Sequence, residues 1–290
     1  MAEPLPICYL NGEFLPFEAA RISPFDRGFL FGDGAYEVMP VYDGRPFRVE
    51  AHCARLTRSL AALRMENPHS AAEWRALFAA LIGRNGGGDQ ALYWQVTRGA
   101  ERGRNHAPLP HLTRTVFMFS SPLALPPQSA RERGIACISA ADTRWARCDI
   151  KSIALLANVL LRELAVEAGA AETILLRGGY LTEGSSSAVH VVKAGEVHTP
   201  PQSPEILPGT TRSVVEELAA RIGIVHLARR VTEAQLRGAD EIWISSAARE
   251  IVPVSTLDGN TVGSGRPGPL WQRIDAALQD YKRELAGQPW

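Results

Sequence analysis

The chain opens with two short apolar runs separated by a turn signal. Ile7–Leu10 and Glu13–Phe17 flank the dipeptide Asn11-Gly12. Because asparagine and glycine tolerate the positive backbone angles of a tight turn, this stretch predicts a β-hairpin. Later segments show either the three-to-four-residue spacing of amphipathic helices or the short apolar runs of strands. The predicted helices span about 50–63, 71–82, 152–168, 212–222 and 270 onward, and the predicted strands about 35–42, 91–98, 113–119, 134–139, 172–176, 188–192 and 241–245.

A proline-rich stretch divides the chain. Residues 120–128 read Ser-Ser-Pro-Leu-Ala-Leu-Pro-Pro-Gln and follow neither the helical nor the strand period, which indicates a boundary between domains. We therefore expect a small N-terminal α/β domain at 1–120, a linker at 121–129 and a larger C-terminal domain at 130–290. Because helices and strands alternate without a regular strand–helix–strand rhythm, the predicted fold class is α+β.

Composition and charge argue against several partners. The chain has 290 residues with 31 basic and 31 acidic side chains, so its formal net charge is zero. Binding to nucleic acid or to an anionic membrane surface needs clustered positive charge, and neither partner is expected. A hydrophobic content of 46% with 21% charged residues is typical of a globular protein. The apolar runs are too short to span a bilayer.

Cysteine spacing and the N-terminal sequence bear on location. Cys8, Cys53, Cys137 and Cys148 lie far apart, without the close pairs of a zinc site or a disulfide framework, which favours a reducing compartment. The first residues lack the basic and apolar regions of a secretory signal. We therefore expect a cytoplasmic protein, and its size favours an enzyme. The absence of GxSxG, GxxxxGK[ST] and HExxH motifs argues against serine hydrolases, P-loop nucleotidases and zincins.

Lys151 is one of only three lysines among the 31 basic residues. It precedes the apolar run Ile153–Ala157, and Ser152 beside it is a candidate helix cap. Partly apolar surroundings favour the neutral amine of a lysine, which is the form that adds to an aldehyde and forms a Schiff base. Alternatively, Lys151 packs its stem on the helix and keeps its ammonium group in water.

Two further motifs could bind the ring and the phosphate of a pyridine aldehyde. Glu183 lies in the run Leu-Thr-Glu-Gly-Ser-Ser-Ser at 181–187. A carboxylate there could keep a pyridine nitrogen protonated, which makes the ring an electron sink; alternatively, it is the acid of a hydrophilic turn. The run Ile-Leu-Pro-Gly-Thr-Thr-Arg at 206–212 opens a predicted helix. Its free N–H groups, threonine hydroxyls and dipole could bind phosphate, although other helix starts look similar.

Together these features resemble the fold-type-IV pyridoxal-phosphate enzymes, which include branched-chain and D-amino-acid aminotransferases and aminodeoxychorismate lyase. The resemblance runs from about Tyr9 to Trp271. It implies pyridoxal 5'-phosphate as the cofactor, a C-terminal cofactor-binding domain with a mixed β-barrel-like sheet, and a homodimer with shared active sites. The segments that carry it are Asp26–Glu37, His52–Leu56, Cys148–Ser152 and Thr182–Ser187.

The resemblance implies a role for each matching residue. Lys151 would form the Schiff base and later move the proton between the substrate Cα and the cofactor. Glu183 would pair with the pyridine nitrogen, and Arg55 would bind the cofactor phosphate. The other residues implied in cofactor binding are Ser186, Leu207, Thr210, Thr211 and Ser246.

Three positions depart from the family pattern. Ala247 replaces a hydroxyl residue in the loop at 245–250, so we expect one hydrogen bond to the phosphate to be absent. Ala154 and Ala188 stand where relatives often carry asparagine. Neither of these two alanines has an evident functional consequence.

The loop at 96–106 bears on which family member the chain resembles most. In D-amino-acid aminotransferases, an Arg-x-His pair from this loop binds the substrate α-carboxylate across a dimer interface, and Arg104 and His106 match that pair. A guanidinium suits bidentate carboxylate binding, and an imidazole can add a hydrogen bond. The resemblance implies Tyr36 as the third member of this group and Ser187 as a further substrate contact.

The predicted function is transfer of the amino group of a D-amino acid, such as D-alanine, to a 2-oxo acid, such as 2-oxoglutarate. Alternatively, the 96–106 loop is a solvated basic segment, in which Arg98 and Arg102 leave the register open. A branched-chain aminotransferase of L-substrates and an aminodeoxychorismate lyase remain alternatives within the family. A ligand-binding module without catalysis is the alternative from another class.

Overall fold

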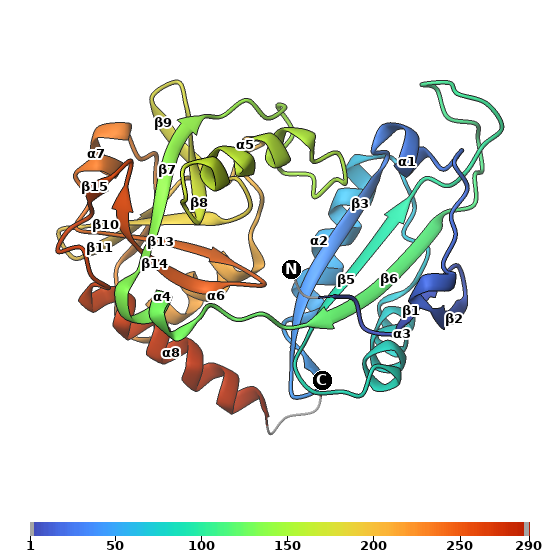
Figure 1. Cartoon of the computed structure of the whole chain (residues 1–290), viewed down its shortest axis with the longest axis horizontal. Coiled ribbons are helices and arrows are strands. Elements are labelled where there is room, and N and C mark those ends of the chain that lie inside the picture. Colours follow the sequence, from blue (N-terminus) through green and yellow to red (C-terminus); the bar gives the residue numbers. More distant parts are fainter. Residues whose placement is uncertain (1–2, 287–289) are drawn as a thin grey trace. The chain divides into compact units, whose positions relative to one another are not determined.

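The computed structural model describes residues 3–286 and 290. The chain forms two compact units, which we describe separately (Figure 1). No helix among the described residues is long and apolar enough to cross a membrane. In the described part of the chain, unit 1 comprises residues 3–124, 150–155 and 290, and unit 2 comprises residues 125–149 and 156–286.

Unit 1 contains a six-stranded antiparallel sheet. Its elements are β1 (Ile7–Leu10), β2 (Glu13–Pro16), the 3-10 helix η1 (Phe17–Ala19), α1 (Arg27–Phe31), β3 (Gly34–Tyr42), β4 (Arg45–Pro46), α2 (Val49–Ala62), α3 (Ala71–Arg84), β5 (Gln90–Thr97) and β6 (Thr115–Pro122). The strands follow the order β2-β1-β6-β5-β3-β4. The predicted hairpin is confirmed, because Asn11 and Gly12 form the turn with φ values of 50° and 105°.

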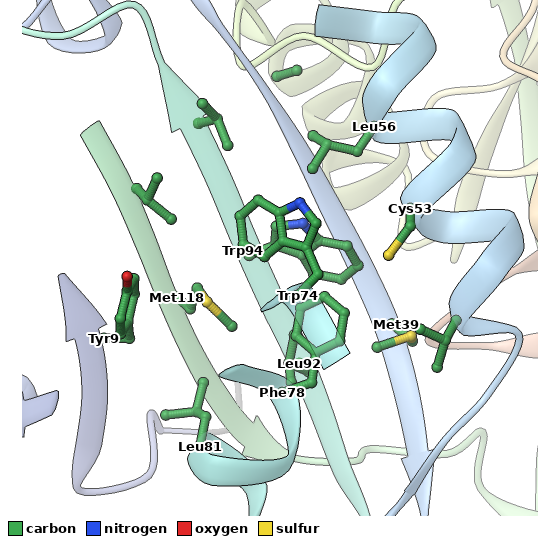
Figure 2. Packing of buried hydrophobic residues seen from close by; sticks show 14 of the residues in the cluster. Tyr9, Met39, Cys53, Leu56, Trp74, Phe78, Leu81, Leu92, Trp94 and Met118 are labelled. Atoms are coloured by element: carbon green, nitrogen blue, oxygen red, sulfur yellow. The ribbon is translucent and has the colours of Figure 1, made fainter. Parts of the chain in front are cut away.

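Helices α2 and α3 contribute apolar side chains to the core of unit 1. Alternate residues of a strand point to the same face of its sheet, and Trp94 of β5 thereby meets Trp74 and Phe78 of α3 (Figure 2). Leu56 of α2 and Met39 of β3 belong to the same cluster. All five side chains are fully buried. This packing determines which residues of β3 point inward, including the acidic residue two positions before Met39.

Unit 2 contains a larger, mixed sheet. Its elements are α4 (Gln128–Arg133), β7 (Ile135–Ala141), α5 (Leu156–Glu167), β8 (Glu172–Arg177), β9 (Tyr180–Gly184), β10 (Ala188–Lys193), β11 (Glu196–Thr199), α6 (Thr210–Arg221), β12 (His226–Ala228), α7 (Glu233–Arg237), β13 (Glu241–Ser246), β14 (Glu250–Leu257), β15 (Asn260–Thr261) and α8 (Pro269–Ala286). The strand order is β12-β11-β10-β13-β14-β7-β8-β9, and β15 pairs with β14.

The sheet of unit 2 curls into a half-barrel. The pairs β11–β12, β14–β7 and β7–β8 are parallel, and the other pairs are antiparallel. Strand β9 ends the strand order but also contacts β10, as expected when a sheet closes on itself. Helices α5 and α6 connect the parallel pairs β7–β8 and β11–β12 (Figure 1). The predicted α+β class with a mixed, barrel-like sheet is confirmed.

Residues 150–155 belong to unit 1, although the residues on both sides of them in the sequence belong to unit 2. Ser152 forms an antiparallel β-bridge with Ala35 of β3. The backbone N–H of Tyr36 donates to the carbonyl of Lys151 over 2.9 Å. The prediction that Ser152 caps a helix is therefore wrong, because this segment pairs with β3 and α5 begins only after it.

Most of the predicted elements are confirmed within a few residues. The missed elements are short, except for the eight-residue strand β14. Helix α1 lies in a stretch that its glycine and aspartate content marks as a loop. Strand β9 contains Glu183, so the alternative that this residue lies in a hydrophilic turn is wrong. The predicted domain ranges 1–120, 121–129 and 130–290 stay a prediction, to which the structure adds the position of 150–155 in unit 1.

Candidate active site

Lys151 lies beside β3 with its amine over an aromatic ring. The Nζ atom is 4.2 Å from the centroid of the Tyr36 ring, and that ring stacks on Tyr93 at 5.6 Å. The backbone N–H of Lys151 donates to Ser59 Oγ of α2 over 3.1 Å. Backbone pairing with β3 and the hydrogen bond to the Ser59 hydroxyl of α2 therefore hold the main chain of Lys151 in place and leave its side chain free to reach the ring.

The other two lysines are bound to carboxylates. Lys193 Nζ lies 2.9 Å from Asp240, and Lys282 Nζ lies 2.5 Å from Glu250. Among the residues that the structure describes, Lys151 has no such acidic partner. The missing carboxylate partner leaves the Lys151 amine available for reaction, which distinguishes it from the other two lysines as the candidate nucleophile.

Arg55 is held by a buried carboxylate. Glu37 points from β3 into unit 1, and its two oxygens accept hydrogen bonds from Arg55 Nε and Nη2, each over 2.7 Å. His52, one turn earlier on α2, is 2.8 Å from the same carboxylate through Nδ1. All three side chains are at most 4% exposed. This triad determines the direction of the Arg55 guanidinium.

The charges of the triad follow from burial and pairing. Burial raises the pKa of Glu37, but the Arg55 guanidinium and the His52 hydrogen bond outweigh this and lower it to about 2. Burial also lowers the pKa of His52, so the imidazole is neutral and donates through Nδ1. The triad therefore contains one carboxylate, one guanidinium and one neutral imidazole.

Glu183 has a different arrangement in unit 2. Its Oε1 accepts a hydrogen bond from Arg144 Nη1, and its Oε2 accepts one from the Leu207 N–H over 3.1 Å. The same guanidinium binds Asp142 through Nε and Nη2, both at 2.9 Å. Burial raises the pKa of Glu183, and Arg144 only partly opposes this effect. A further cationic donor would therefore favour the ionised form of Glu183.

The serine run after Glu183 converges on another buried acid. Ser186 Oγ and Ser187 Oγ lie 3.0 and 3.1 Å from Glu172 Oε2, and Ser185 Oγ donates to Oε1. Arg249 Nη1 is 3.2 Å from the same carboxylate. Glu172, at the start of β8, is fully buried. It therefore orders the loop that carries Ser186 and Ser187.

Helix α6 begins with two buried threonines. Gly209 at its N-cap supplies no side-chain hydrogen bond, and Thr210 and Thr211 follow it. The first N–H groups of a helix have no partner within the helix and favour an anion. Ser246 ends β13, and Ala247 begins the turn to β14 in the same unit.

Arg104 and His106 lie on the exposed loop that connects β5 to β6. Both pack on Phe31: Arg104 Cζ is 5.0 Å and the His106 ring centroid is 5.5 Å from the centre of its ring. Arg98, in contrast, is bound to Asp33 through Nε and Nη2 at 2.7 and 3.0 Å. The Arg98 guanidinium is therefore bound to an acid within unit 1, whereas the Arg104 guanidinium lies at the surface of the loop.

Three of the charged residues in these arrangements are not predicted from the sequence. Glu37, Glu172 and Arg144 are buried and bind candidate residues. The available signal was a charge within or beside an apolar strand pattern, because such a charge needs a partner. The candidate residues in unit 1 are Tyr36, Arg55, Arg104, His106 and Lys151, and those in unit 2 are Glu183, Ser186, Ser187, Leu207, Thr210, Thr211 and Ser246.

Comparison of the sequence with known proteins gives one consistent result. Residues 34–257 match the family model "amino-transferase class IV". A D-alanine aminotransferase from Bacillus licheniformis is 40% identical over 270 residues, which is 93% of this chain and 95% of that protein. A D-alanine aminotransferase from Staphylococcus aureus (strain MW2) is 38% identical over 274 residues, or 94% of this chain and 96% of that protein.

Comparison of the structure gives the same fold. A branched-chain amino acid aminotransferase from Escherichia coli superposes with a TM-score of 0.90 at 28% identity, covering 95% of this chain and 94% of that one. A second branched-chain amino acid aminotransferase, solved with pyridoxamine 5'-phosphate, superposes with a TM-score of 0.87 at 28% identity, covering 95% of this chain and 93% of that one.

Proposed function

We propose that this chain, which belongs to the amino-transferase class IV family, transfers the amino group of a D-amino acid to a 2-oxo acid. D-Alanine and 2-oxoglutarate would give pyruvate and D-glutamate. The support from the sequence is identity of up to 40% with D-alanine aminotransferases over almost the whole chain. The structural observation that carries the proposal is the Lys151 amine, which lies over Tyr36 and has no carboxylate partner among the described residues.

Pyridoxal 5'-phosphate is the cofactor of this family, and the residues of both units suit its chemistry. When bound, its ring withdraws the electrons that remain as the Cα–H bond of the substrate breaks. We propose that Glu183 binds the ring nitrogen, because burial raises the pKa of this carboxyl and a cationic N–H donor would stabilise its ionised form. The residues proposed for the phosphate and the remaining cofactor contacts are Arg55, Ser186, Leu207, Thr210, Thr211 and Ser246.

Lys151 has two proposed tasks. Its Nζ would hold the cofactor at the aldehyde carbon, and the same atom would take the proton from the substrate Cα. Both tasks need the neutral amine. The backbone pairing of residues 150–155 with β3 keeps the main chain fixed while the side chain exchanges partners.

Substrate carboxylate binding is proposed for the exposed loop between β5 and β6. Arg104 can form two parallel hydrogen bonds to a carboxylate, and His106 can add a third. The two residues share Phe31 as a packing partner, which keeps their side chains near each other. Tyr36 beside Lys151 and Ser187 after Glu183 are the other proposed substrate contacts.

An enantiomer assay tests the proposed reaction. Purified protein with pyridoxal 5'-phosphate should convert D-alanine and 2-oxoglutarate to pyruvate at a rate far above that of L-leucine transamination. Lys151→Ala should abolish turnover, whereas Lys193→Ala, which removes an exposed lysine paired with Asp240, should retain it. Arg104→Ala should raise the KM for D-alanine and leave the cofactor absorbance largely unchanged. Full D-alanine turnover and affinity in Arg104→Ala would contradict the carboxylate role.

A branched-chain aminotransferase of L-substrates is the second candidate. The observation in its favour is the close superposition on branched-chain aminotransferases, with TM-scores up to 0.90. That likeness carries only 28% sequence identity, against 40% for the D-alanine aminotransferase. Preferred turnover of L-leucine in the same assay would establish this alternative.

We also propose that the chain forms a homodimer. Helix α5 has a stripe of exposed apolar residues at helical spacing, with Leu156 72%, Leu160 61% and Leu164 41% exposed. Val159 and Val166 of the same helix are also more than half exposed. A contiguous apolar stripe of this kind is typical of a protein–protein interface. Light scattering of the eluting protein should give twice the 31.5 kDa chain mass, and a mass of one chain would contradict the dimer.

A reducing compartment, such as the cytoplasm, is the proposed location. All four cysteines are free thiols and buried in the structure. Unpaired cysteines are ordinary where glutathione and thioredoxin keep thiols reduced. Cell fractionation with an antibody against the chain would test this assignment.

A further inference from the structure

The loop that carries Arg104 and His106 has no regular secondary structure of its own. It spans residues 98–114 between β5 and β6, and most of its residues are exposed. A loop that binds a carboxylate needs its guanidinium in one place, because a misplaced donor loses most of its hydrogen-bond energy. The structure shows which residues hold this loop.

Asp26 closes the base of the loop. Its Oδ2 accepts hydrogen bonds from Thr97 Oγ1 at the end of β5, over 3.0 Å, and from Thr115 Oγ1 at the start of β6, over 2.6 Å. An isolated β-bridge joins Asp26 to Ala100, and the N–H of Arg27 donates to the Gly99 carbonyl over 2.9 Å. The segment that begins α1 therefore ties both stems together.

Arg27 reaches the middle of the loop. Its Nη1 donates to the backbone carbonyl of Asn105 over 2.7 Å, and its Nη2 donates to the carbonyl of His106 over 2.9 Å. Nη1 also binds the carboxylate of Glu101, whose other oxygen accepts from the Leu109 N–H over 3.0 Å. The Arg27 side chain is only 4% exposed. One buried guanidinium thus contacts the loop at three points through groups of fixed geometry.

Arg27 is itself anchored from the other side. Asp33 accepts from Arg27 Nε over 2.8 Å and from Arg98, whose Nη2 also donates to the Leu63 carbonyl at the end of α2 over 2.8 Å. The Arg27 Cζ atom lies 4.7 Å from the centre of the Phe31 ring. Arg104 packs on the same ring. The motif at 26–34 therefore connects the loop to α2 and leaves Arg27 little freedom to move.

We propose that Arg27 is a positioning residue that sets the place of Arg104 and His106 for substrate carboxylate binding. This inference rests on the carboxylate role of Arg104 proposed above. Two of the three contacts from Arg27 go to backbone carbonyls of the loop, so they act on the path of the main chain at the residues next to and at the substrate-binding pair. The two acids of the 26–34 motif, Asp26 and Asp33, support this anchor.

The test uses two reagents that share one nucleophile. Aminooxyacetate carries a carboxylate and hydroxylamine does not, and both react with the cofactor aldehyde in the holoenzyme with a change in absorbance. The ratio of their second-order rate constants therefore reports carboxylate recognition. We expect Arg104→Ala to lower this ratio about tenfold to a hundredfold, the effect of losing hydrogen bonds to a charged group. Hydroxylamine should react equally fast with every variant.

Arg27→Gln should lower the ratio nearly as far as Arg104→Ala. The double variant should show no further loss, because Arg27 acts through Arg104. Arg27→Lys keeps a positive charge beside Asp33 and Glu101 but has no planar fork for both carbonyls, so its ratio should lie between those of the wild type and Arg27→Gln. Arg221→Gln, which removes an exposed arginine paired with Glu284, is the matched control and should keep the wild-type ratio.

A second measurement needs neither cofactor nor turnover. Trypsin cleaves after arginine, and Arg102 and Arg104 are exposed on the loop. In the apoprotein, cleavage after Arg102 should be faster in Arg27→Gln than in wild type or Arg221→Gln, as measured by mass spectrometry of the fragments. Equal cleavage rates would contradict the anchoring of the loop by Arg27.

The outcomes separate the two proposals. If Arg104→Ala keeps the wild-type ratio of rate constants, the carboxylate role of Arg104 is wrong. If the ratio of rate constants falls in Arg104→Ala but stays at the wild-type value in both Arg27→Gln and Arg27→Lys, the positioning role of Arg27 is wrong. A lower ratio in both Arg104→Ala and Arg27→Gln, with no further decrease in the double variant, supports the inference.

Discussion

Two buried glutamates, one in each unit, bind arginine, but their pKa values shift in opposite directions. Glu37 in unit 1 is 0% exposed and Glu183 in unit 2 is 6% exposed. The pKa of Glu37 falls to about 2, because Arg55 and His52 outweigh the effect of burial. The pKa of Glu183 rises, because burial outweighs Arg144. Burial beside an arginine is therefore not enough to determine the charge of a carboxyl group.

The difference lies in how each guanidinium is shared. Arg55 uses two nitrogens on Glu37, one on each carboxylate oxygen. Arg144 uses two nitrogens on Asp142 and only one on Glu183. A guanidinium that is already neutralised by a second carboxylate stabilises the first one less. The structure thus contains one carboxyl group whose pKa lies below its ordinary value and one whose pKa lies above it. A further cationic partner would favour the ionised form of the second.

Replacing the two glutamates should have unequal effects on stability, and this is the largest effect we expect. Glu37→Gln removes the charge that faces the buried Arg55, which should cost about 3–5 kcal/mol in the free energy of unfolding. Glu183→Gln should cost clearly less, because Arg144 keeps its pair with Asp142. Urea unfolding of the two apoproteins measures both losses. Equal losses would show that the sharing of Arg144 has no energetic consequence.

The pH dependence of stability should also differ between the two glutamates. The folded-state pKa of Glu37 lies below its unfolded value of 4.5, so its contribution, about 3 kcal/mol from the shift to about 2, is present above pH 4.5 and is lost as the pH falls toward 2. The folded-state pKa of Glu183 lies above 4.5. Its contribution is therefore present below pH 4.5 and is lost as the pH rises through the folded-state value.

Unfolding of wild type and of each glutamine variant across this pH range measures these contributions. The stability difference between wild type and Glu37→Gln should shrink on acidification below pH 4.5. The difference between wild type and Glu183→Gln should change in favour of the variant as the pH rises above 4.5. Parallel curves for the two variants would contradict the comparison.

The smallest expected effect is a change in the titration of Glu183 when Asp142 loses its charge. Asp142→Asn leaves the Arg144 guanidinium to Glu183 and removes a negative charge that adds to the effect of burial, so the pKa of Glu183 should fall. Carbon-13 NMR of labelled glutamate carboxyls would follow the titration. Glu37 is the internal control, and its signal should not move. An unchanged Glu183 signal would mean that Asp142 has no influence on its pKa.

Local chemistry accounts for the parts of the fold that the sequence predicts. The Asn11-Gly12 hairpin and helices α2 and α3 depend on turn residues and on apolar spacing within a few positions. Ser152 shows where this fails. It has the side chain of a helix cap, but its backbone pairs with Ala35, which lies far away in the sequence. The distant strand offers hydrogen bonds that the local sequence does not indicate.

The residues of the candidate site also fall into two groups, those that the sequence predicts and those that only the fold identifies. Lys151, Glu183 and the Thr210–Thr211 helix start are visible as motifs because their chemistry resides in consecutive residues. The roles of Arg27 and Glu37 are not, since Arg27 meets Asn105 and Glu37 meets Arg55 only after the sheet has formed. Partners that come from different elements leave no common pattern in the sequence, and only the fold identifies them.

The interrupted course of unit 1 along the chain has a consequence for synthesis. A nascent chain emerges from its N-terminus, and domains generally fold as they emerge. Residues 3–124 leave the ribosome well before residues 150–155. The backbone of β3 that pairs with Ser152 therefore has no partner from this segment while α4 and β7 are translated. A fragment that stops at residue 124 would keep the core shown in Figure 2 and lack Lys151. Unit 1 therefore reaches its complete form only after translation of unit 2 has begun.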